Sequence, residues 1–245
     1  MPPIAINVYS VRELDESTID IIDRVGDAGY DGIQFSGPFG PHADDPEAIQ
    51  TALAEQSLVA TPPHVSINQL QSDLETVIDQ YEPLDVDGVV IPSIGRDHFA
   101  DADAVDAIAA DVNDLEEQTA DYGWDLHYHN HAHEYVDLGN ETAFDRFIEK
   151  TSVGIELDVG WALVGGDDPA ARIQSLGDRA SLIHMKDMKL DGERNFAEIG
   201  DGDVDMAACA EAAESVEAAW LIYEHDQPAD PAGTIPHGAD YLRAL

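Results

Sequence analysis

An alternation of short apolar segments with longer amphipathic segments runs through the whole chain and constrains its fold more than any other feature. Eight segments have the composition and length of β-strands, and each is followed by a segment with helical periodicity. The strand starts recur every roughly 25 to 35 residues, which is the repeat of a βα unit. The expected strands span residues 4–10, 31–35, 58–66, 88–92, 153–159, 181–186 and 220–224, with one more inside 124–135.

The same pattern predicts one domain that spans residues 1–245. Neither a shift in composition nor a long linker divides the chain, and its length suits a (β/α)8 barrel. We therefore expect an α/β fold with a single (β/α)8 TIM barrel, with a doubly wound open sheet as the alternative. The expected helices span residues 17–27, 46–56, 69–81, 102–122, 142–150, 204–216 and 239–245, with another that begins near 169.

The charge of the chain is strongly acidic and is spread along nearly every expected helix and turn. Lys and Arg number 11 and Asp and Glu number 51, which gives a formal net charge of −40. Such a surface repels itself at low ionic strength and is screened by salt, so we expect a salt-adapted, cytoplasmic protein. The charge argues against nucleic acid and anionic membranes as partners. It also makes capture of a phosphorylated substrate harder, unless Arg and Lys line the site.

Several classes of protein are disfavoured by the residues themselves. No apolar run reaches the ~18 residues of a membrane span, and the first residues lack the features of a secretion signal. Cys209 is the single cysteine, which excludes an internal disulfide and a cysteine-based zinc cluster. The glycines match neither a dinucleotide fingerprint nor a Walker loop. Asn140 is interpreted as a helix cap rather than a glycosylated residue. The sequence does not decide the oligomeric state, and a homo-oligomer is compatible with it.

Residues 124–135, WDLHYHNHAHEY, contain four histidines and one glutamate. In an extended strand, His127, His129 and His131 point to one side, and Glu134 lies beyond the strand's end. Imidazole and carboxylate groups together suit zinc, manganese, iron or cobalt. Histidine-rich tracts also bind metals adventitiously, so this stretch alone does not define a site.

Polar residues also end the three strands that follow. Asp158 ends the sixth expected strand, His184 and Lys186 end the seventh, and Glu224 ends the eighth. The C-terminal ends of barrel strands form the functional face, so these side chains should meet there. Each would cost stability if buried alone, whereas a shared divalent cation would satisfy them. The simpler explanations are a cap for Asp158, a core histidine for His184 and an ion pair between Lys186 and Asp187.

Four motifs carry a family resemblance: YHNHAHE (128–134), ELDVGWALVGGDDP (156–169), HMKD (184–187) and YEHDQ (223–227). In their order and spacing the chain resembles the sugar phosphate isomerase/epimerase branch of the xylose isomerase-like TIM-barrel superfamily, which is related to AP endonuclease family 2. The resemblance covers essentially the whole chain. It implies metal ligation by Asp158, His184 and Glu224.

The resemblance also indicates the other members of the site. Relatives often carry a glutamate inside the fifth strand, where this chain has histidines. We therefore expect Glu134, just beyond that strand, to be the metal ligand. His129 or His131 would replace it as ligand or act as an acid/base group. Relatives often have a glutamate at the position of Gln34. The glutamine of this chain fits a neutral hydrogen bond to a sugar hydroxyl. The expected substrate-binding residues are Gln34, His64, His131 and Trp161.

The implied activity is that of a metal-dependent isomerase or epimerase acting on a sugar, sugar phosphate or keto-sugar. One divalent ion, expected to be Mn²⁺, with Mg²⁺, Co²⁺ or Zn²⁺ as alternatives, would polarise the carbonyl, and a base would move the neighbouring proton through an enediolate. Glu224 is the expected base, and His129 or Glu134 is the expected acid/base group on the opposite side of the substrate. Lys186 would stabilise the negative charge that develops on the substrate oxygen. The alternatives are a lyase or dehydratase of an inosose or 3-keto sugar, an endonuclease IV-like repair enzyme and a non-catalytic sugar-binding barrel.

Overall fold

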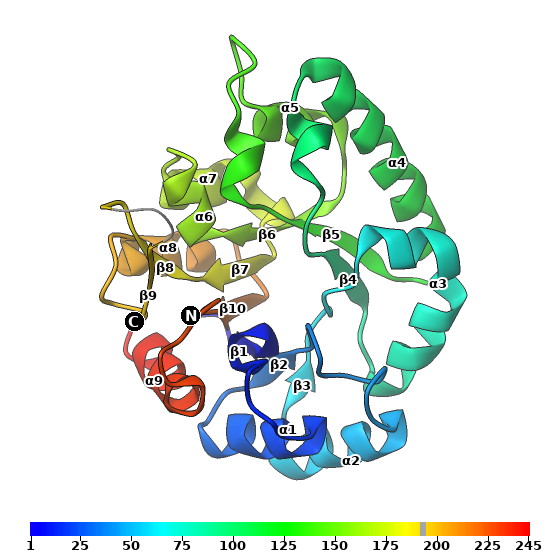
Figure 1. Ribbon diagram of the computed structural model, residues 1–245, viewed down its shortest axis with the longest axis vertical. Helices are drawn as coiled ribbons and strands as arrows, with labels where there is room; N and C mark the ends of the chain where they lie inside the picture. Colours follow the sequence, from blue (N-terminus) through cyan, green and yellow to red (C-terminus); the bar gives the residue numbers. More distant parts are fainter. Residues whose placement is uncertain (192–194) are drawn as a thin grey trace.

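The computed structural model describes residues 1–191 and 195–245 and confirms the (β/α)8 barrel. Eight parallel strands lie in the order β3-β2-β1-β10-β7-β6-β5-β4. A parallel bridge between His64, beyond β3, and Val90 in β4 joins the two ends of this order into a ring (Figure 1). The strands are β1 (Ile4–Asn7), β2 (Gly32–Gln34), β3 (Val59–Ala60), β4 (Gly88–Ile91), β5 (Asp125–His129), β6 (Gly154–Asp158), β7 (Leu182–Met185) and β10 (Trp220–Tyr223).

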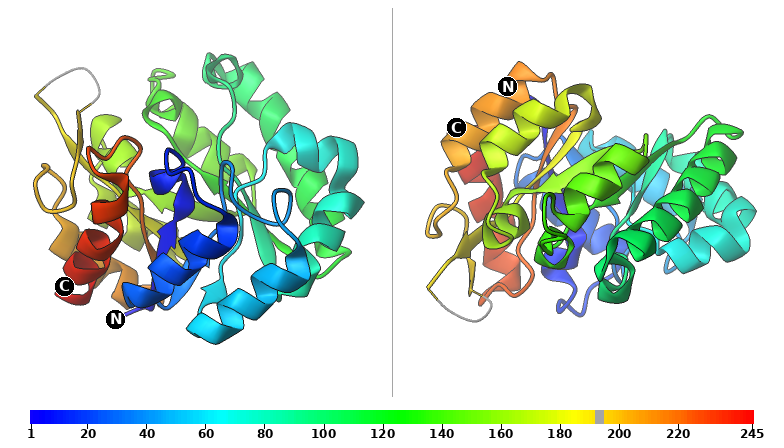
Figure 2. Two further views of the ribbon diagram at one scale, coloured as in Figure 1. Left: turned by 60° about the horizontal axis from the view of Figure 1, so that its bottom comes forward. Right: turned by 90° about the horizontal axis from the view of Figure 1, so that it is seen from above.

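Helices surround the ring of strands, as the views in Figure 2 show. Ser17 caps α1, as expected, by accepting a backbone N–H of the first turn. Asn140 is not the cap of α5, because the hydroxyl of Thr142 accepts the N–H of Asp145. The helices are α1 (Thr18–Asp27), α2 (Pro46–Gln56), α3 (Ile67–Tyr81), α4 (Ala102–Ala120), α5 (Ala143–Lys150), α6 (Val159–Val164), α7 (Pro169–Leu176), α8 (Met206–Ser215) and α9 (Pro231–Arg243).

Most strands are one or two residues shorter than expected, and β1 and β3 are much shorter, for local reasons. Strand β1 ends at Asn7, whose side chain accepts the N–H of Tyr9 and starts a 3-10 helix. Strand β3 has two residues, because Pro62 and Pro63 follow and lack the N–H that a sheet ladder needs. The 3-10 helices are η1 (Val8–Val11), η2 (Glu82–Leu84), η3 (Arg96–Phe99), η4 (Ala132–Tyr135) and η5 (Gly177–Arg179).

The end of the chain holds elements that the sequence pattern did not predict. Strands β8 (Asp187–Lys189) and β9 (Asn195–Ala197) form an antiparallel hairpin after β7. Helix α9 begins eight residues earlier than expected, with Pro231 in its first turn, where the missing N–H is not needed. None of the helices in the described part of the chain combines the length and apolar character that crossing a membrane requires.

The barrel interior changes from apolar to polar along the strands. Ala5, Val90, Leu182 and Ile222 form a small buried cluster, separate from the main core that includes outward-facing strand residues and the helices. Because side chains alternate along a strand, every second residue beyond this cluster also points inward. These further inward positions are polar and buried: Asn7, Gln34, His129, Glu156, Asp158, His184, Lys186 and Glu224.

Candidate metal centre and substrate pocket

Glu156, from the middle of β6, lies at the centre of this polar interior and is completely buried. Its Oε1 accepts a 2.6 Å hydrogen bond from Nε2 of Gln34. Its Oε2 lies 2.6 Å from Nε2 of His64, 2.9 Å from Nδ1 of His129 and 3.1 Å from Nε2 of His184. Burial opposes ionisation of this carboxyl, but His184 and His64 outweigh it and hold its pKa well below the usual range. Glu156 is therefore a carboxylate enclosed by three imidazoles.

Four side chains from β5, β6, β7 and the end of β10 converge beside Glu156. Each offers one ligand atom, and these atoms all lie within 4.8 Å of one another. Nε2 of His129 is 3.7 Å from Oδ2 of Asp158, and Nδ1 of His184 is 3.0 Å from Oε2 of Glu224. Two imidazoles and two carboxylates suit Mn²⁺, Fe²⁺, Co²⁺ or Zn²⁺. We call these four buried residues the ligand cluster: His129, Asp158, His184 and Glu224.

Asp158 has one oxygen that is bonded and one that is not. Oδ1 accepts the N–H of Trp161 at 2.8 Å and caps α6. Oδ2 is buried without a hydrogen bond from the described residues, because Nζ of Lys186, although 2.9 Å away, is not in hydrogen-bonding geometry. Burial raises the pKa of this carboxyl to about 6. The cap explains Oδ1 alone, and the unsatisfied Oδ2 fits a cation in the ligand cluster.

Lys186 places a buried ammonium among three carboxylates. Its Nζ lies 2.7 Å from Glu224, 2.9 Å from Asp158 and 3.1 Å from Asp226. Burial disfavours the charged form, but the carboxylates outweigh it, so the pKa of Lys186 stays well above its usual value. Asp187, the partner in the simpler explanation, instead accepts backbone N–H groups of the loop that follows β9.

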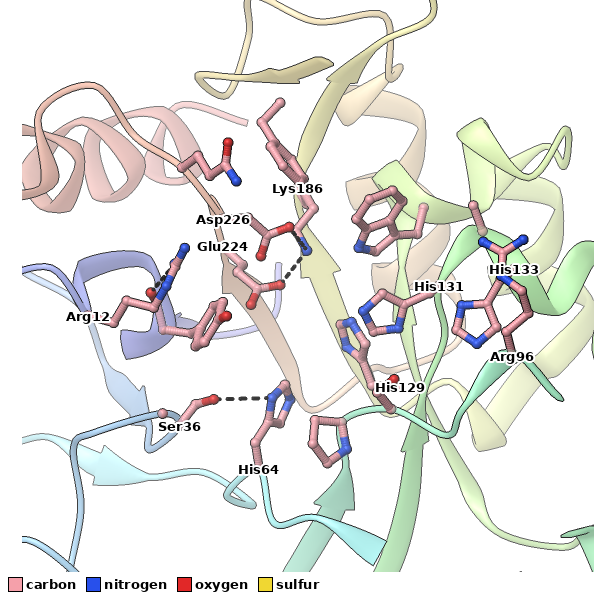
Figure 3. Close-up of a pocket in the computed structure, with 18 residues that line it drawn as sticks. Arg12, Ser36, His64, Arg96, His129, His131, His133, Lys186, Glu224 and Asp226 are labelled. Carbon is pink, nitrogen blue, oxygen red and sulfur yellow. Dashed lines mark hydrogen bonds and ion pairs between the residues drawn. The ribbon is translucent and has the colours of Figure 1, made fainter. Parts of the chain in front are cut away.

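A pocket of about 690 Å³ opens at this end of the barrel, a volume that suits a small ligand. Trp161 forms part of its wall, with its ring centroid 5.5 Å from that of His131 and 5.6 Å from that of Phe196. Burial lowers the pKa of His131 to about 2, so this imidazole is neutral. Arg12 and Arg96 lie on opposite sides of the pocket (Figure 3).

The sequence profile described as xylose isomerase-like TIM barrel matches residues 22–245. The chain belongs to the xylose isomerase-like TIM-barrel family. A curated relative, the inosose dehydratase of Lacticaseibacillus casei, is 30% identical over 173 residues, which cover 62% of this chain and 56% of that protein. The matched region thus spans little more than half the length of this relative.

Solved structures show the same barrel at low sequence identity. A sugar phosphate isomerase/epimerase from Parabacteroides distasonis superposes with a TM-score of 0.81 and 20% identity, over 99% of this chain and 93% of that chain. A D-allulose 3-epimerase from Methylomonas sp. superposes with a TM-score of 0.69 and 14% identity, over 99% of this chain and 97% of that chain. At these identities the likeness establishes the fold of this family and not the reaction.

Glu134, which the family resemblance suggested as the ligand from the fifth strand, lies outside the ligand cluster. It belongs to η4, and its carboxyl group accepts the hydroxyl of Tyr128 at 2.6 Å and the N–H of His131 at 2.8 Å. Burial raises the pKa of this carboxyl to about 8. In this xylose isomerase-like barrel β5 brings His129 to the cluster instead, because alternation along the strand directs that residue inward.

Three of the four residues expected to bind substrate line the pocket, namely His64, His131 and Trp161. Gln34 is not among the residues that line it. Its Nε2 donates to Glu156 at 2.6 Å and to the carbonyl of Pro62 at 2.9 Å. The side chain therefore supports the buried carboxylate.

Among the site residues that sequence reasoning missed, Glu156 and Asp226 contact the expected ones most directly. Glu156 stands between Ile155 and Leu157 at the same strand parity as Asp158, so its inward direction was visible in the sequence. Its contacts with the histidines could not be predicted, because those histidines come from other parts of the barrel. Asp226 lies beyond the end of β10, where alternation no longer predicts direction, and its contact with the lysine had no sequence signal.

Proposed function

We propose that the chain is a divalent-metal-dependent enzyme that isomerises or epimerises a sugar or keto-sugar through an enediolate. The observation that carries this proposal is the convergence of the ligand cluster at a pocket of suitable size for a small carbohydrate. Membership of the xylose isomerase-like family supports it. The mixed set of ring nitrogens and carboxylates is the kind of donor set that such an ion requires.

The ligand cluster would hold one divalent ion, and Mn²⁺ is the metal we propose, with Co²⁺, Zn²⁺ and Mg²⁺ as alternatives. Two imidazole donors support the first three over Mg²⁺, which prefers oxygen ligands. When bound, the ion would supply Lewis acidity that polarises a substrate carbonyl and makes the proton on the neighbouring carbon easier to remove.

Glu224 is the base in this proposal. It lines the pocket at the end of β10, with the ammonium of Lys186 2.7 Å from its Oε2. Glu224 takes the proton from the carbon next to the carbonyl, and a proton that exchanges with solvent is delivered from Glu224 to the former carbonyl carbon. The hydroxyl proton of the first carbon moves to the former carbonyl oxygen. Lys186 stabilises the negative charge that develops on the substrate oxygen. General acid–base catalysis of this kind contributes roughly 10² to 10⁴ in rate.

The position of the acidic groups supports proton transfer on one face of the substrate. Of the two groups expected on the opposite side, His129 has both ring nitrogens directed at carboxylates, Nδ1 at Glu156 and Nε2 at Asp158. Glu134 is enclosed by its contacts with Tyr128 and His131. Among the described residues that line the pocket, the carboxylates are Glu224 and Asp226, and both contact Lys186. One base suffices to carry a proton between adjacent carbons, whereas inversion of a carbon needs groups on both faces. We therefore place aldose–ketose isomerisation ahead of epimerisation.

A lyase or dehydratase that acts on an inosose or 3-keto sugar is the second candidate. The 30% identity to an inosose dehydratase supports it. Its reaction would begin with the same proton removal by Glu224 from the carbon next to the carbonyl. The next carbon, on the side away from the carbonyl, would then lose its hydroxyl group, which leaves as water with the proton that Glu224 has taken. A nuclease is disfavoured by the net charge of −40, because DNA binding requires a basic surface.

The products distinguish these candidates. The Mn²⁺-loaded protein is incubated with ketoses, aldoses, inososes and 3-keto sugars, the ion is removed with a chelator, and the products are identified by NMR. Interconversion of an aldose and a ketose is the expected result. An unsaturated product formed with loss of water would identify the dehydratase. Failure of the metal-loaded protein to turn over any of these classes would overturn the proposal.

A further inference from the structure

One oxygen of Glu156 contacts both histidines of the ligand cluster. Oε2 lies 2.9 Å from Nδ1 of His129 and 3.1 Å from Nε2 of His184, so the two rings present different nitrogens to it. In each ring the other nitrogen faces the cluster. Nε2 of His129 is 3.7 Å from Asp158, and Nδ1 of His184 is 3.0 Å from Glu224. Both rings are thus held between an inner carboxylate and an outer one.

A neutral imidazole has one N–H and one lone pair, and the hydrogen bond made by the N–H decides which nitrogen can bind a metal. We propose that Glu156 is a positioning residue of the metal centre, which accepts the Nδ1–H of His129. At Nε2 of His184 it acts together with Gln34, whose Oε1 lies 2.8 Å from that nitrogen and accepts its N–H, while Glu156 Oε2 lies 3.1 Å away. This arrangement leaves Nε2 of His129 and Nδ1 of His184 as the ligand atoms. The inference rests on the proposed function, because it concerns the same centre.

Glu156 is itself held in place by a chain of amides. Its Oε1 accepts a hydrogen bond from Gln34 at 2.6 Å, and Gln34 also donates to the carbonyl of Pro62 at 2.9 Å. The amide oxygen of Gln34 accepts from Asn7 at 2.7 Å, and Asn7 accepts the N–H of Tyr9 at 2.8 Å. The carboxylate is therefore tied to the backbone after β1 and β3. Ligands are held accurately only when such a support is rigid.

The rival arrangement is an ion held deeper in the barrel by Glu156, His64, His129 and His184, whose ligand atoms also lie within 4.8 Å of one another. That ion would bind Nδ1 of His129 and Nε2 of His184. It would leave the buried Oδ2 of Asp158, which accepts no hydrogen bond from the described residues, with the ammonium of Lys186 at 2.9 Å as its counter-ion and no metal. The two arrangements require opposite tautomers of the same two rings, so they exclude each other.

The tautomers can be read in the wild-type protein. Long-range ¹H–¹⁵N correlation spectra of the Zn²⁺-loaded chain show which ring nitrogen of each histidine carries the proton. The inference expects the proton on Nδ1 of His129 and on Nε2 of His184, with signals assigned through His129→Asn and His184→Asn. Protons on the opposite nitrogens would place the ion in the deeper cluster and overturn it.

Metal affinity tests the same role by substitution. Glu156→Gln keeps the size of the side chain and removes its charge, and Zn²⁺ affinity, measured by competition with a chromophoric chelator, should weaken about 10- to 100-fold. Glu134→Gln is the matched control, because Glu134 is equally buried but contacts Tyr128 and His131. It should bind Zn²⁺ as the wild type does. At saturating Co²⁺ the visible spectrum should change in Glu156→Gln alone, which a purely structural role would not produce.

The outcomes separate this inference from the function on which it rests. Equal Zn²⁺ affinity in wild type and Glu156→Gln would overturn the positioning role and leave the metal centre standing. A loss of affinity confined to Glu134→Gln would overturn it as well. A wild-type chain that binds neither Zn²⁺ nor Co²⁺ would overturn the proposed function and this inference together. If Glu156→Gln does not fold, the wild-type spectra decide.

Discussion

The ammonium of Lys186 lies 2.7 Å from Oε2 of Glu224. The same oxygen lies 3.0 Å from Nδ1 of His184, so one carboxylate oxygen serves both the ligand cluster and a buried cation. A divalent ion in the cluster and the ammonium would repel each other at such a short range, because the site is shielded from water. Lys186 therefore compensates the carboxylates most fully when the protein is free of metal.

Lys186→Met is expected to destabilise the metal-free protein, because Asp158, Glu224 and Asp226 lose their counter-ion. Removing one partner of a buried ion pair costs about 3–5 kcal/mol. Urea unfolding in the presence of a chelator measures this free energy, and Lys189→Met, which removes an exposed lysine, is the control. Mn²⁺ should restore most of the loss. Equal losses in the two variants, or no recovery with Mn²⁺, would argue against shared carboxylates.

Asp158→Asn is expected to abolish metal binding while keeping the fold. The asparagine can still accept the N–H of Trp161 and cap α6, but it lacks the anionic oxygen that the ligand cluster needs. Bound metal, measured by mass spectrometry after dialysis, should fall from about one ion per chain to almost none. Asp101→Asn is the control, because Asp101 caps α4 in the same way and is not a member of the ligand cluster. This variant should bind as much metal as the wild type. Retention of the ion by Asp158→Asn would remove this residue from the centre.

Stability is expected to rise with KCl, because the net charge of −40 is spread over the surface. The screening length falls from about 30 Å at 0.01 M salt to about 3 Å at 1 M. The Tm measured by calorimetry should rise by at least about 5 °C, which for a chain of this size corresponds to roughly 2 kcal/mol. A non-electrolyte at matched osmolarity should have a smaller effect. A Tm that stays flat between dilute buffer and molar KCl would contradict salt adaptation.

Cys209, in α8, is expected to be unreactive in the folded protein. The residue is 1% exposed, and burial raises the pKa of its thiol to about 12. Because the thiolate is the reactive form and forms only as pH rises toward that value, modification by a disulfide reagent at pH 8 should be slow. It should become fast once denaturant unfolds the chain. Rapid modification of the native protein at pH 8 would contradict the burial of this thiol.

The barrel was predictable because the repeat of strand and helix is a local property of the sequence. The elements that the sequence did not predict were missed for local reasons as well. Helix α6 has six residues, and the hairpin strands β8 and β9 have three each, so none is long enough to show a period. Helix α9 contains Pro236, and a proline inside a helix hides the pattern that would have marked its first two turns.

The meeting of Asp158, His184 and Glu224 could also be predicted, because each lies at the end of a strand and parallel strands end on one face. Their role as metal ligands stays a prediction. The choice between His129 and Glu134 depends on where β5 stops and η4 begins, and such boundaries are set by packing that one sequence does not reveal.

The surroundings of Glu156 show the same limit more sharply. His64 and His129, which contact its Oε2, lie 92 and 27 positions away in the chain. Strand parity predicts only that the glutamate points inward. Only the closure of the barrel decides that imidazoles from β5, β7 and the segment after β3 surround one oxygen.

The central claim is that this centre removes a proton from the carbon next to a substrate carbonyl with the help of a bound metal. The most direct measurement is the incorporation of deuterium from D₂O into the turned-over sugar, followed by NMR for the Mn²⁺-loaded wild type and for Asp158→Asn. We expect deuterium at the carbon next to the carbonyl in the wild type, and labelling at least about 10²-fold slower in the variant. Turnover without deuterium, or labelling that continues unchanged in Asp158→Asn, would contradict the account.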